Sequence, residues 1–272
     1  MLVSISHNDF MKKGTVWGRL ALRFVFGPFE RFQTNRLPDE DLVVPTGGLN
    51  LKIFAPRHNR VAASIYTKGV WEPEVTGALR ALIKPGDTVF DIGGDAGYYT
   101  VIFAKLVGSS GRGVVFEPIP KAQERIMENV ALNDYHNVEM VDLALGSKPG
   151  SFVLERPFQD SRINLNKVEP GPEDILVKVI RFDDLAKERV LPRADLIKID
   201  VEGAELEILR GMEAYVATNH PTFVIELHPS LLPQFGASVE DVIQWLKERG
   251  YTLTALDAGD VSLTEATTFV AR

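Results

Sequence analysis

A glycine-rich turn directly after an apolar strand is the strongest chemical signal in the sequence. Residues 89–100 run Val-Phe-Asp-Ile-Gly-Gly-Asp-Ala-Gly-Tyr-Tyr-Thr, and glycines in such a turn let the backbone approach a ligand closely. The spacing differs from the G-x-G-x-x-G of dinucleotide-binding turns, and no Lys-Ser/Thr follows as in a P-loop. Asp91 and Asp95 would repel a pyrophosphate, but they suit a ligand that has a positive centre and hydroxyl groups. S-adenosylmethionine has both.

Two further carboxylates follow the next two expected strands. Glu117 ends the second strand, where a carboxylate can accept hydrogen bonds from both ribose hydroxyls. Asp142 ends the third strand, where it would accept from an adenine amino group while the N–H of Leu143 donates to a ring nitrogen. Each residue alone has a structural alternative, such as a helix cap for Asp91. Three polar groups at three successive strand ends favour a cofactor site.

The elements that position these groups alternate from about Gly86 onward. Strands are expected at 88–92, 113–117, 138–145, 195–200 and 222–227, and helices at 98–107, 120–132, 204–216 and from 239 to about 249. Apolar strands separated by helices predict a parallel sheet covered on both faces. A hairpin is expected at 151–154 and 176–181, around a polar loop at 157–172 that we expect to be functional. Residues 251–256 and 261–270 are expected as a terminal strand pair.

Composition excludes several classes of protein. The chain has 30 Lys+Arg against 37 Asp+Glu, a formal charge of -7, so no global basic field favours nucleic acid. With 0 Cys, thiolate zinc sites, iron–sulfur clusters, disulfides and cysteine nucleophiles are excluded. No stretch approaches the ~20 apolar residues that span a bilayer, and no signal-peptide pattern is present. We therefore expect an intracellular, cytoplasmic protein.

The amino-terminal part differs in pattern from the rest, and we expect an accessory segment at 1–65 and a catalytic domain at 66–272. Residues 16–29 mix aromatic and aliphatic side chains with basic ones. This pattern predicts a helix that either serves a peripheral membrane or homodimer contact or packs on the core. Residues 42–54 are expected to form a hairpin turned at Gly47-Gly48.

Taken in order, these sequence blocks resemble the FkbM-type S-adenosylmethionine-dependent methyltransferases, which have the class I methyltransferase fold. The resemblance covers residues 68–229 and rests on 69–74, 91–100, 116–118 with 128–133, 195–205 and 225–229. The family's glycine run is closer to D-x-G-A-N-x-G, so Gly94 and Asp95 stand where Ala and Asn are usual. The resemblance implies an α/β, Rossmann-like sheet in the order 3-2-1-4-5-7-6, with the last strand antiparallel and helices on both faces.

The cofactor implied is S-adenosylmethionine, with S-adenosylhomocysteine as the product. Asp95 adds a charge beside this cofactor, which would change its affinity without changing its identity. The expected cofactor-binding residues are Glu72, Asp91, Gly93, Gly94, Asp95, Gly97, Tyr98, Glu117, Pro118, Asp142 and Leu143.

Polar residues also follow the fourth and fifth expected strands, across the sheet from Gly93, and are expected to flank the methyl group. Asp200, Glu202 and Glu226 would either orient the acceptor hydroxyl or hold a divalent ion through oxygen ligands; no metal ligand is assigned. His228 is expected to act as the general base, with a structural, hydrogen-bonded histidine as the alternative.

Two charged residues near this group have structural interpretations. Glu205 is expected on the helix surface or as a cap of the first helical turn. Lys198 is expected either in a buried ion pair or in an active role. His220 precedes the fifth strand and is therefore expected to lie far from the site.

The function expected from the resemblance is O-methylation of a sugar, glycolipid or secondary metabolite, so the partner is a small-molecule, glycan or glycolipid acceptor. The acceptor oxygen would attack the sulfonium methyl in line, and catalysis would come mostly from positioning. Two alternatives remain open at this stage. One is N-methylation, which needs no strong base, and the other is a cofactor-binding assembly partner that transfers no methyl group.

Overall fold

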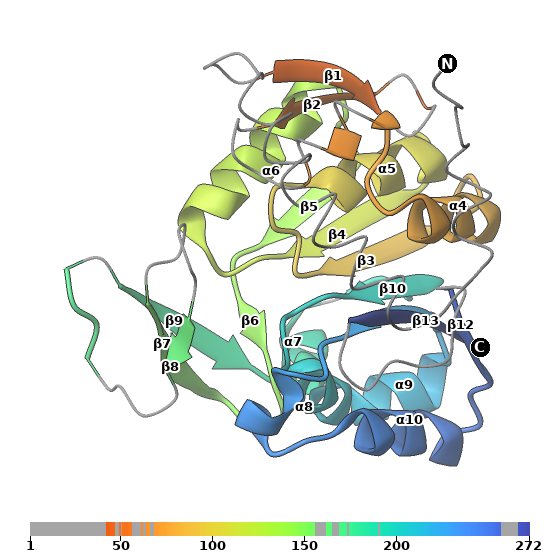
Figure 1. The fold of residues 1–272 in the computed structure, drawn as a ribbon. Helices are drawn as coiled ribbons and strands as arrows, with labels where there is room; N and C mark the ends of the chain where they lie inside the picture. The colour runs from red at the N-terminus through yellow and green to blue at the C-terminus, as the bar shows by residue number, and fades with distance from the viewer. Residues whose placement is uncertain are drawn as a thin grey trace, which may run out of the picture.

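A computed structural model describes residues 42–46, 49, 51–55, 61, 64–65, 68–155, 162–164, 169–172, 174–189, 191–256 and 266–272. Figure 1 shows a central sheet between two layers of helices, with a smaller sheet beside it. Within the described residues, no helix is both long and apolar enough to cross a membrane. The expected helix at 16–29 lies outside the described residues.

The central sheet has the expected topology. Its strands are β3 (Thr88–Ile92), β4 (Arg112–Phe116), β5 (Val138–Val141), β10 (Leu196–Ile199), β11 (Thr222–Leu227), β12 (Leu253–Ala255) and β13 (Thr267–Ala271). Counted along the chain within this sheet, their spatial order is 3-2-1-4-5-7-6. The last strand, β13, is antiparallel to both of its neighbours. The fold-class prediction is therefore confirmed.

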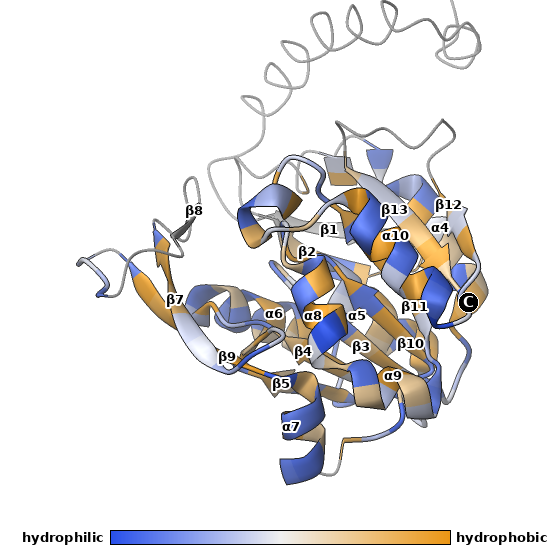
Figure 2. Ribbon diagram, turned by 90° about the horizontal axis from the view of Figure 1, so that it is seen from below, coloured by the Kyte–Doolittle hydropathy of each residue, from blue (hydrophilic) through white to orange (hydrophobic). Residues whose placement is uncertain are grey.

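Helices cover both faces of this sheet (Figure 1). One layer contains α4 (Pro73–Leu82), α5 (Tyr98–Val107) and α6 (Pro120–Leu132), and the other contains α7 (Phe182–Glu188), α8 (Glu205–Gly211), α9 (Glu213–Asn219), α10 (Val239–Glu248) and the short η1 (Leu232–Phe235). Side chains along β3 alternate between the layers: Phe90 and Ile92 pack in the α7–α10 layer, and Val89 packs in the α4–α6 layer. Figure 2 shows hydrophobic residues concentrated on the central strands and a mostly hydrophilic α7.

Helix starts follow local sequence signals. Pro120 occupies the first turn of α6, where its missing N–H costs nothing. Ser238 caps α10: its hydroxyl accepts the N–H of Asp241, whose carboxylate accepts the N–H of Ser238. Both starts were expected from the sequence.

The expected strand at 138–145 is wrong as a single element. It divides into β5 and β6 (Ala144–Leu145), which belong to different sheets. β6 pairs in parallel with β9 (Ile175–Ile180), which draws the chain away from the central sheet after Val141. The expected hairpin is confirmed as β7 (Gly150–Glu155) paired with β9, and β8 (Arg162–Asn164) adds a strand within the polar loop.

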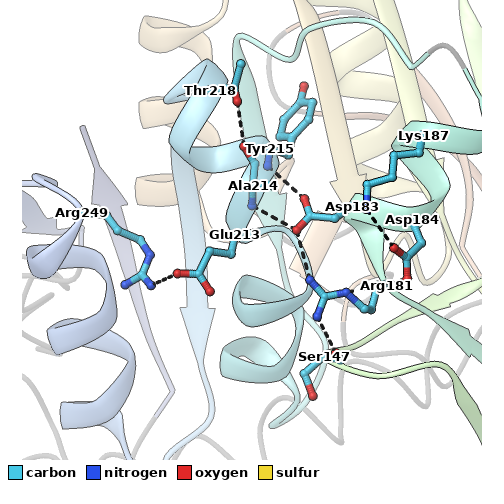
Figure 3. A network of polar contacts seen from close by, with 10 residues as sticks. All are labelled: Ser147, Arg181, Asp183, Asp184, Lys187, Glu213, Ala214, Tyr215, Thr218 and Arg249. Atoms are coloured by element: carbon cyan, nitrogen blue, oxygen red, sulfur yellow. Dashed lines mark hydrogen bonds and ion pairs between the residues drawn. The ribbon is translucent and has the colours of Figure 1, made fainter.

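The expected helix at 204–216 is also wrong as a single element, because it breaks at Met212 into α8 and α9. Asp183, at the start of α7, supplies the reason. Its carboxylate oxygens accept the N–H groups of Ala214 and Tyr215 at 3.0 and 2.9 Å (Figure 3). A buried side chain from another helix thus satisfies amides at the start of α9 that would otherwise lack partners.

The hairpin expected at 42–54 is confirmed as β1 (Leu42–Thr46) and β2 (Leu51–Ala55). It lies over α6, where Asn129 Oδ1 accepts the N–H of Phe54 at 2.7 Å. Leu51 and Ile53 are 1% and 2% exposed and belong to the core of the α4–α6 layer. This hairpin therefore shares the hydrophobic core of the main sheet.

Candidate functional site

The predicted cofactor residues lie at one edge of the central sheet. β3, β4 and β5 are adjacent parallel strands, so the residues that follow their carboxyl ends share one edge. The glycine-rich turn links β3 to α5, Glu117 follows β4, and Asp142 follows β5. Such an edge is where ligands bind in open α/β sheets.

Gly93 connects this turn to the fourth strand of the sheet. Its φ is 90°, and a Cβ built on it would lie 1.9 Å from the carbonyl oxygen of Asp200. No side chain fits there, and the left-handed backbone also favours glycine. The turn therefore runs directly against the residue that follows β10.

Asp91 is buried at the end of β3, with a side chain that is incompletely paired. It is 2% exposed, and its Oδ2 accepts a hydrogen bond from Thr100 at 2.6 Å. Its Oδ1 is buried without a hydrogen-bond partner. Burial raises the pKa of Asp91 to about 6. This oxygen can accept a hydrogen bond from a cationic ligand group.

Glu117 is 4% exposed and braces the glycine-rich turn. Its two oxygens accept the N–H groups of Asp95 at 3.1 Å and Ile119 at 2.9 Å. Burial raises its pKa to about 7. A carboxylate has about four acceptor positions, so two remain for ligand hydroxyls. Asp95 itself is exposed and has a left-handed φ of 46°.

Three other residues expected around the cofactor follow β4 and β5 at this edge, and they are less buried than Asp91 and Glu117. Asp142 is exposed, and Leu143 and Pro118 are half-buried. Leu143 packs against the core of the α7–α10 layer. An exposed Asp142 is open to a ligand from solvent.

Tyr98 has a structural contact that the sequence did not suggest. It is 4% exposed, and its hydroxyl bonds the backbone N–H and C=O of Trp71 at 3.1 and 3.2 Å. These bonds hold the segment before α4 against α5. That segment carries Glu72, whose Oε2 accepts a hydrogen bond from the Tyr99 hydroxyl at 2.5 Å. Tyr98 therefore positions Glu72 through Trp71.

Lys198 forms a buried ion pair, which was one of the two roles expected for it from the sequence. It is 2% exposed, its Nζ lies 2.9 Å from Asp200 Oδ2, and it also lies 4.4 Å from the centre of the Tyr99 ring. Burial would lower the pKa of Lys198, but the carboxylates of Asp200 and Asp91 raise it above its usual value. Burial would raise the pKa of Asp200, but the ammonium holds it below its usual value.

His228 lies between three carboxylates. Its Nδ1 is 2.8 Å from Glu205 Oε1, and its Nε2 is 3.9 Å from Asp200 Oδ1 and 3.8 Å from Glu226 Oε1. Burial would lower the pKa of His228, but the hydrogen bond to Glu205 and the neighbouring carboxylates raise it to about 9. Burial and the Asp200 carboxylate raise the pKa of Glu226. The structure thus brings together three of the four expected catalytic residues.

Glu202, the fourth, lies outside this group. Its side chain is exposed on the turn between β10 and α8, where its φ is 52°. His220 is remote, as expected: its ring stacks on Tyr251 at 4.2 Å, and its Nε2 lies 3.2 Å from the Arg249 carbonyl.

Three side chains, including that of His228, lie close enough together to be considered as metal ligands. Ligand atoms of Asp200, Glu226 and His228 lie within 4.8 Å of one another, a distance that a divalent ion could bridge. Asp200 is already paired with the Lys198 ammonium.

Two residues of the site were missed in the sequence. Of the two interpretations of Glu205, a position on the helix surface is wrong, because its side chain is fully buried. Its carboxylate instead accepts the N–H of Gly203, just before the first turn of α8. A signal was present: Glu205, Ile208, Leu209 and Met212 have the i, i+3, i+4, i+7 spacing of one helix face, and all four are buried. Tyr99 has no comparable signal, because its partners lie far away in the sequence.

A hollow of about 500 Å³ lies away from this site, on the surface around Arg181, Arg210 and Arg249. Its arginines each contact a carboxylate within the protein, so the hollow offers little unpaired charge. The contacts are Arg181 with Asp183, Arg210 with Glu207 and Arg249 with Glu213.

Comparison with protein families identifies one that covers this region. The family model described as "Methyltransferase FkbM domain" matches residues 91–253. This range includes the glycine-rich turn, Glu117, Asp142 and the His228 group.

Curated proteins with detectable similarity include two with named acceptors. The chain is 27% identical over 180 residues to "Hexuronic acid methyltransferase AglP" of Haloferax volcanii, covering 65% of this chain and 68% of that protein. It is 24% identical over 202 residues to "31-O-demethyl-FK506 methyltransferase FkbM" of Streptomyces tacrolimicus, covering 64% and 75%. Among solved structures, Methyltransferase FkbM from Methylobacillus flagellatus KT aligns with a TM-score of 0.46 at 12% identity, covering 92% of this chain and 60% of that one.

Proposed function

The chain belongs to the FkbM methyltransferase family, and from this premise we propose that it transfers the methyl group of S-adenosylmethionine to a hydroxyl oxygen of a sugar, glycolipid or secondary metabolite. The observation that carries the proposal is the gap between His228 Nε2 and the carboxylates of Asp200 and Glu226. Both distances, 3.9 and 3.8 Å, are too long for hydrogen bonds. An acceptor hydroxyl in this gap would face His228 Nε2 and the carboxyl groups of Asp200 and Glu226.

The residues present fit the cofactor. The buried Asp91 Oδ1 lacks a donor, and the methionine ammonium of the cofactor would supply one. Glu117 has acceptor capacity left for ribose hydroxyls, and Asp142 with the Leu143 N–H would hold the adenine. The turn from Gly93 to Gly97, with Gly94 and Asp95, would line the cofactor, next to Glu72 and Pro118; Tyr98 contributes by holding the Glu72 segment.

When bound, S-adenosylmethionine supplies an electrophilic methyl group on a sulfonium centre. The chain must therefore hold the acceptor oxygen in line and remove its proton. His228 takes this proton at Nε2, while Asp200 and Glu226 orient the hydroxyl. The exposed Glu202 would contact a more distant part of the acceptor.

The acceptor class rests on the relatives. Their names assign a hexuronic acid to one and 31-O-demethyl-FK506 to the other. A hexuronic acid carries hydroxyl groups on saturated carbon, and the name 31-O-demethyl denotes an oxygen that lacks its methyl group. Such hydroxyls are weak acids, so a positioned base is useful for them.

We also propose that residues 66–272 form the catalytic domain and that residues 1–65 are accessory, with 16–29 providing a homodimer or peripheral membrane contact. Strand β2 buries Leu51 and Ile53 and hydrogen-bonds to Asn129, which makes this part of the accessory segment a structural support for α6.

The test is transfer of an isotope-labelled methyl group from S-adenosylmethionine to fractionated glycans, glycolipids and secondary metabolites. The expected product is a methyl ether, formed by the wild type and not by a His228→Gln variant. Parallel reactions with a chelator or with added Mg²⁺ decide metal dependence. A product methylated on nitrogen would contradict the proposal. Cofactor binding without transfer to any fraction would favour a non-catalytic role.

A further inference from the structure

Glu205 contacts His228 at Nδ1, on the other side of the imidazole ring from Nε2. We infer that Glu205 is a positioning residue that holds the His228 imidazole by Nδ1, so that Nε2 faces the gap where the acceptor hydroxyl binds. This inference rests on the proposed role of His228. The contact between Nδ1 and Glu205 Oε1 is 2.8 Å.

Because Glu205 is fully buried, its carboxylate needs a hydrogen-bonding partner inside the protein. The residue is 0% exposed, and an ionised carboxylate in that position is costly unless it is paired and hydrogen-bonded. Its Oε1 accepts the Gly203 N–H at 3.0 Å as well as the His228 contact, and its Oε2 is buried without a hydrogen-bond partner. Among the described residues, the His228 imidazole is the side chain that hydrogen-bonds to this buried carboxyl group.

The backbone holds the carboxylate as well as the imidazole. Glu205 begins α8, and its bond to Gly203 ties the side chain to the turn that follows β10. His228 follows β11, which is paired in parallel with β10. His228 thus directly follows β11, and Glu205 begins the helix that follows the neighbouring strand β10, so both residues lie at the same edge of the sheet.

The consequence for His228 is a fixed ring orientation. When Nδ1 carries the hydrogen and donates it to Glu205, the neutral ring has its lone pair on Nε2. That nitrogen faces Asp200 Oδ1 and Glu226 Oε1 without bonding to either. In free imidazole, no partner selects this tautomer.

Charged groups from several elements act on the ring. Asp200 and Lys198 lie on or after β10, Glu226 lies on β11, Glu205 begins α8, and Glu202 lies on the turn before it. Only Glu205 makes a hydrogen bond to the ring among the described residues. Its removal should therefore change the tautomer, which the loss of a distant charge would not do.

Nuclear magnetic resonance of the full chain labelled with ¹⁵N-histidine tests the inference without an acceptor. The protein has 5 His, and a His228→Gln variant assigns the relevant signals. In the wild type at high pH, we expect Nδ1–H and an unprotonated Nε2. Glu205→Gln keeps an acceptor oxygen, so the tautomer should persist while the His228 pKa falls by about one unit or more. Glu205→Ala should lose the tautomer preference.

Glu207→Gln is the matched control, because it makes the same substitution on the same helix at a residue paired with Arg210. It should leave the His228 signals unchanged. An Nε2–H tautomer in the wild type, or identical tautomer and pKa in Glu205→Gln and the wild type, would overturn the inference.

A kinetic measurement adds the functional consequence once an acceptor is identified. Glu205→Ala should lower kcat at least about tenfold, with the KM for S-adenosylmethionine nearly unchanged, and Glu205→Gln should recover part of the loss. Equal kcat values in Glu205→Ala and the wild type would contradict the inference. Absence of methyl transfer by the wild type would instead contradict the proposed function, and the resonance result would stand independently.

Discussion

Asp91 and Lys198 are paired in register on the adjacent parallel strands β3 and β10, and both are 2% exposed. Lys198 nevertheless directs its ammonium to Asp200, at 2.9 Å. Asp91 consequently keeps an oxygen without a hydrogen-bond partner. The protein thus holds a buried, incompletely paired carboxylate where the cofactor is proposed to bind.

Asp91→Asn should stabilise the ligand-free protein by about 2–3 kcal/mol above pH 7, because a pKa of about 6 in the folded state lies about two units above the unfolded value. The raised pKa means that the folded state holds the proton more tightly. The contribution of Asp91 to the free energy of unfolding is therefore largest below about pH 4, and it is lost as the pH rises through 6. Urea unfolding at pH 4 and pH 7.5 should show the variant's advantage only at the higher pH. The same variant should bind S-adenosylmethionine more weakly, and an equal advantage at both pH values would contradict the explanation.

Glu117→Ala should weaken S-adenosylmethionine binding by about 1–3 kcal/mol, through lost hydrogen bonds to ribose and a less rigid glycine-rich turn. Isothermal titration calorimetry measures the change. Glu124→Ala on the exposed side of α6 is the control and should bind normally. Unchanged affinity in Glu117→Ala would remove this residue from the cofactor site.

His228→Gln should lower kcat by roughly 10²–10⁴ and leave the affinity for S-adenosylmethionine nearly constant. Glutamine is preferable to alanine, because it retains a polar group next to the buried Glu205. Near-normal turnover of this variant between pH 6 and pH 9 would leave positioning alone as the source of catalysis.

The wild-type rate should rise as pH increases towards the raised pKa of His228, about 9. Below that pH the imidazole carries a proton and cannot accept another one from the hydroxyl. A kcat profile from pH 6 to 10 measures the inflection. A rate that is already maximal at pH 6 would be inconsistent with a His228 base.

Asp183→Ala should destabilise the protein by about 1–2 kcal/mol, because the amides of Ala214 and Tyr215 lose their buried acceptor. Thermal unfolding measures the change, and binding of S-adenosylmethionine should be unaffected. Asp184→Ala, at the more exposed neighbouring position, should change stability by less than about 0.5 kcal/mol. Equal effects of the two substitutions would show that the cap contributes little.

Deletion of residues 1–35 should leave S-adenosylmethionine binding intact and change sedimentation or liposome binding. Extending the deletion through Ala55 should also lower stability, because it removes Leu51 and Ile53 from the core. Calorimetry and thermal unfolding of the two truncated proteins separate these effects. Loss of cofactor binding in the shorter deletion would show that these residues support the site.

Much of the fold and of the cofactor edge was predictable from local sequence. Parallel strands place all their carboxyl ends on one edge, so the order of strand, turn and helix was enough to bring Gly93, Glu117 and Asp142 together. The starts of α6 and α10 were predictable for a similar reason, because Pro120 and the Ser238–Asp241 capping box act within a single helical turn.

The chemistry of individual side chains depended on contacts between distant residues. Lys198 pairs with Asp200 although Asp91 is its neighbour in register, and the buried Glu205 is hydrogen-bonded to His228, which lies 23 positions away. The break at Met212 likewise depends on Asp183 of α7. The sequence by itself determined which polar groups reach the functional edge, since strand period and turn chemistry are local properties. Only the tertiary structure decided their partners and protonation, because burial and Coulomb interactions depend on distances in the folded chain.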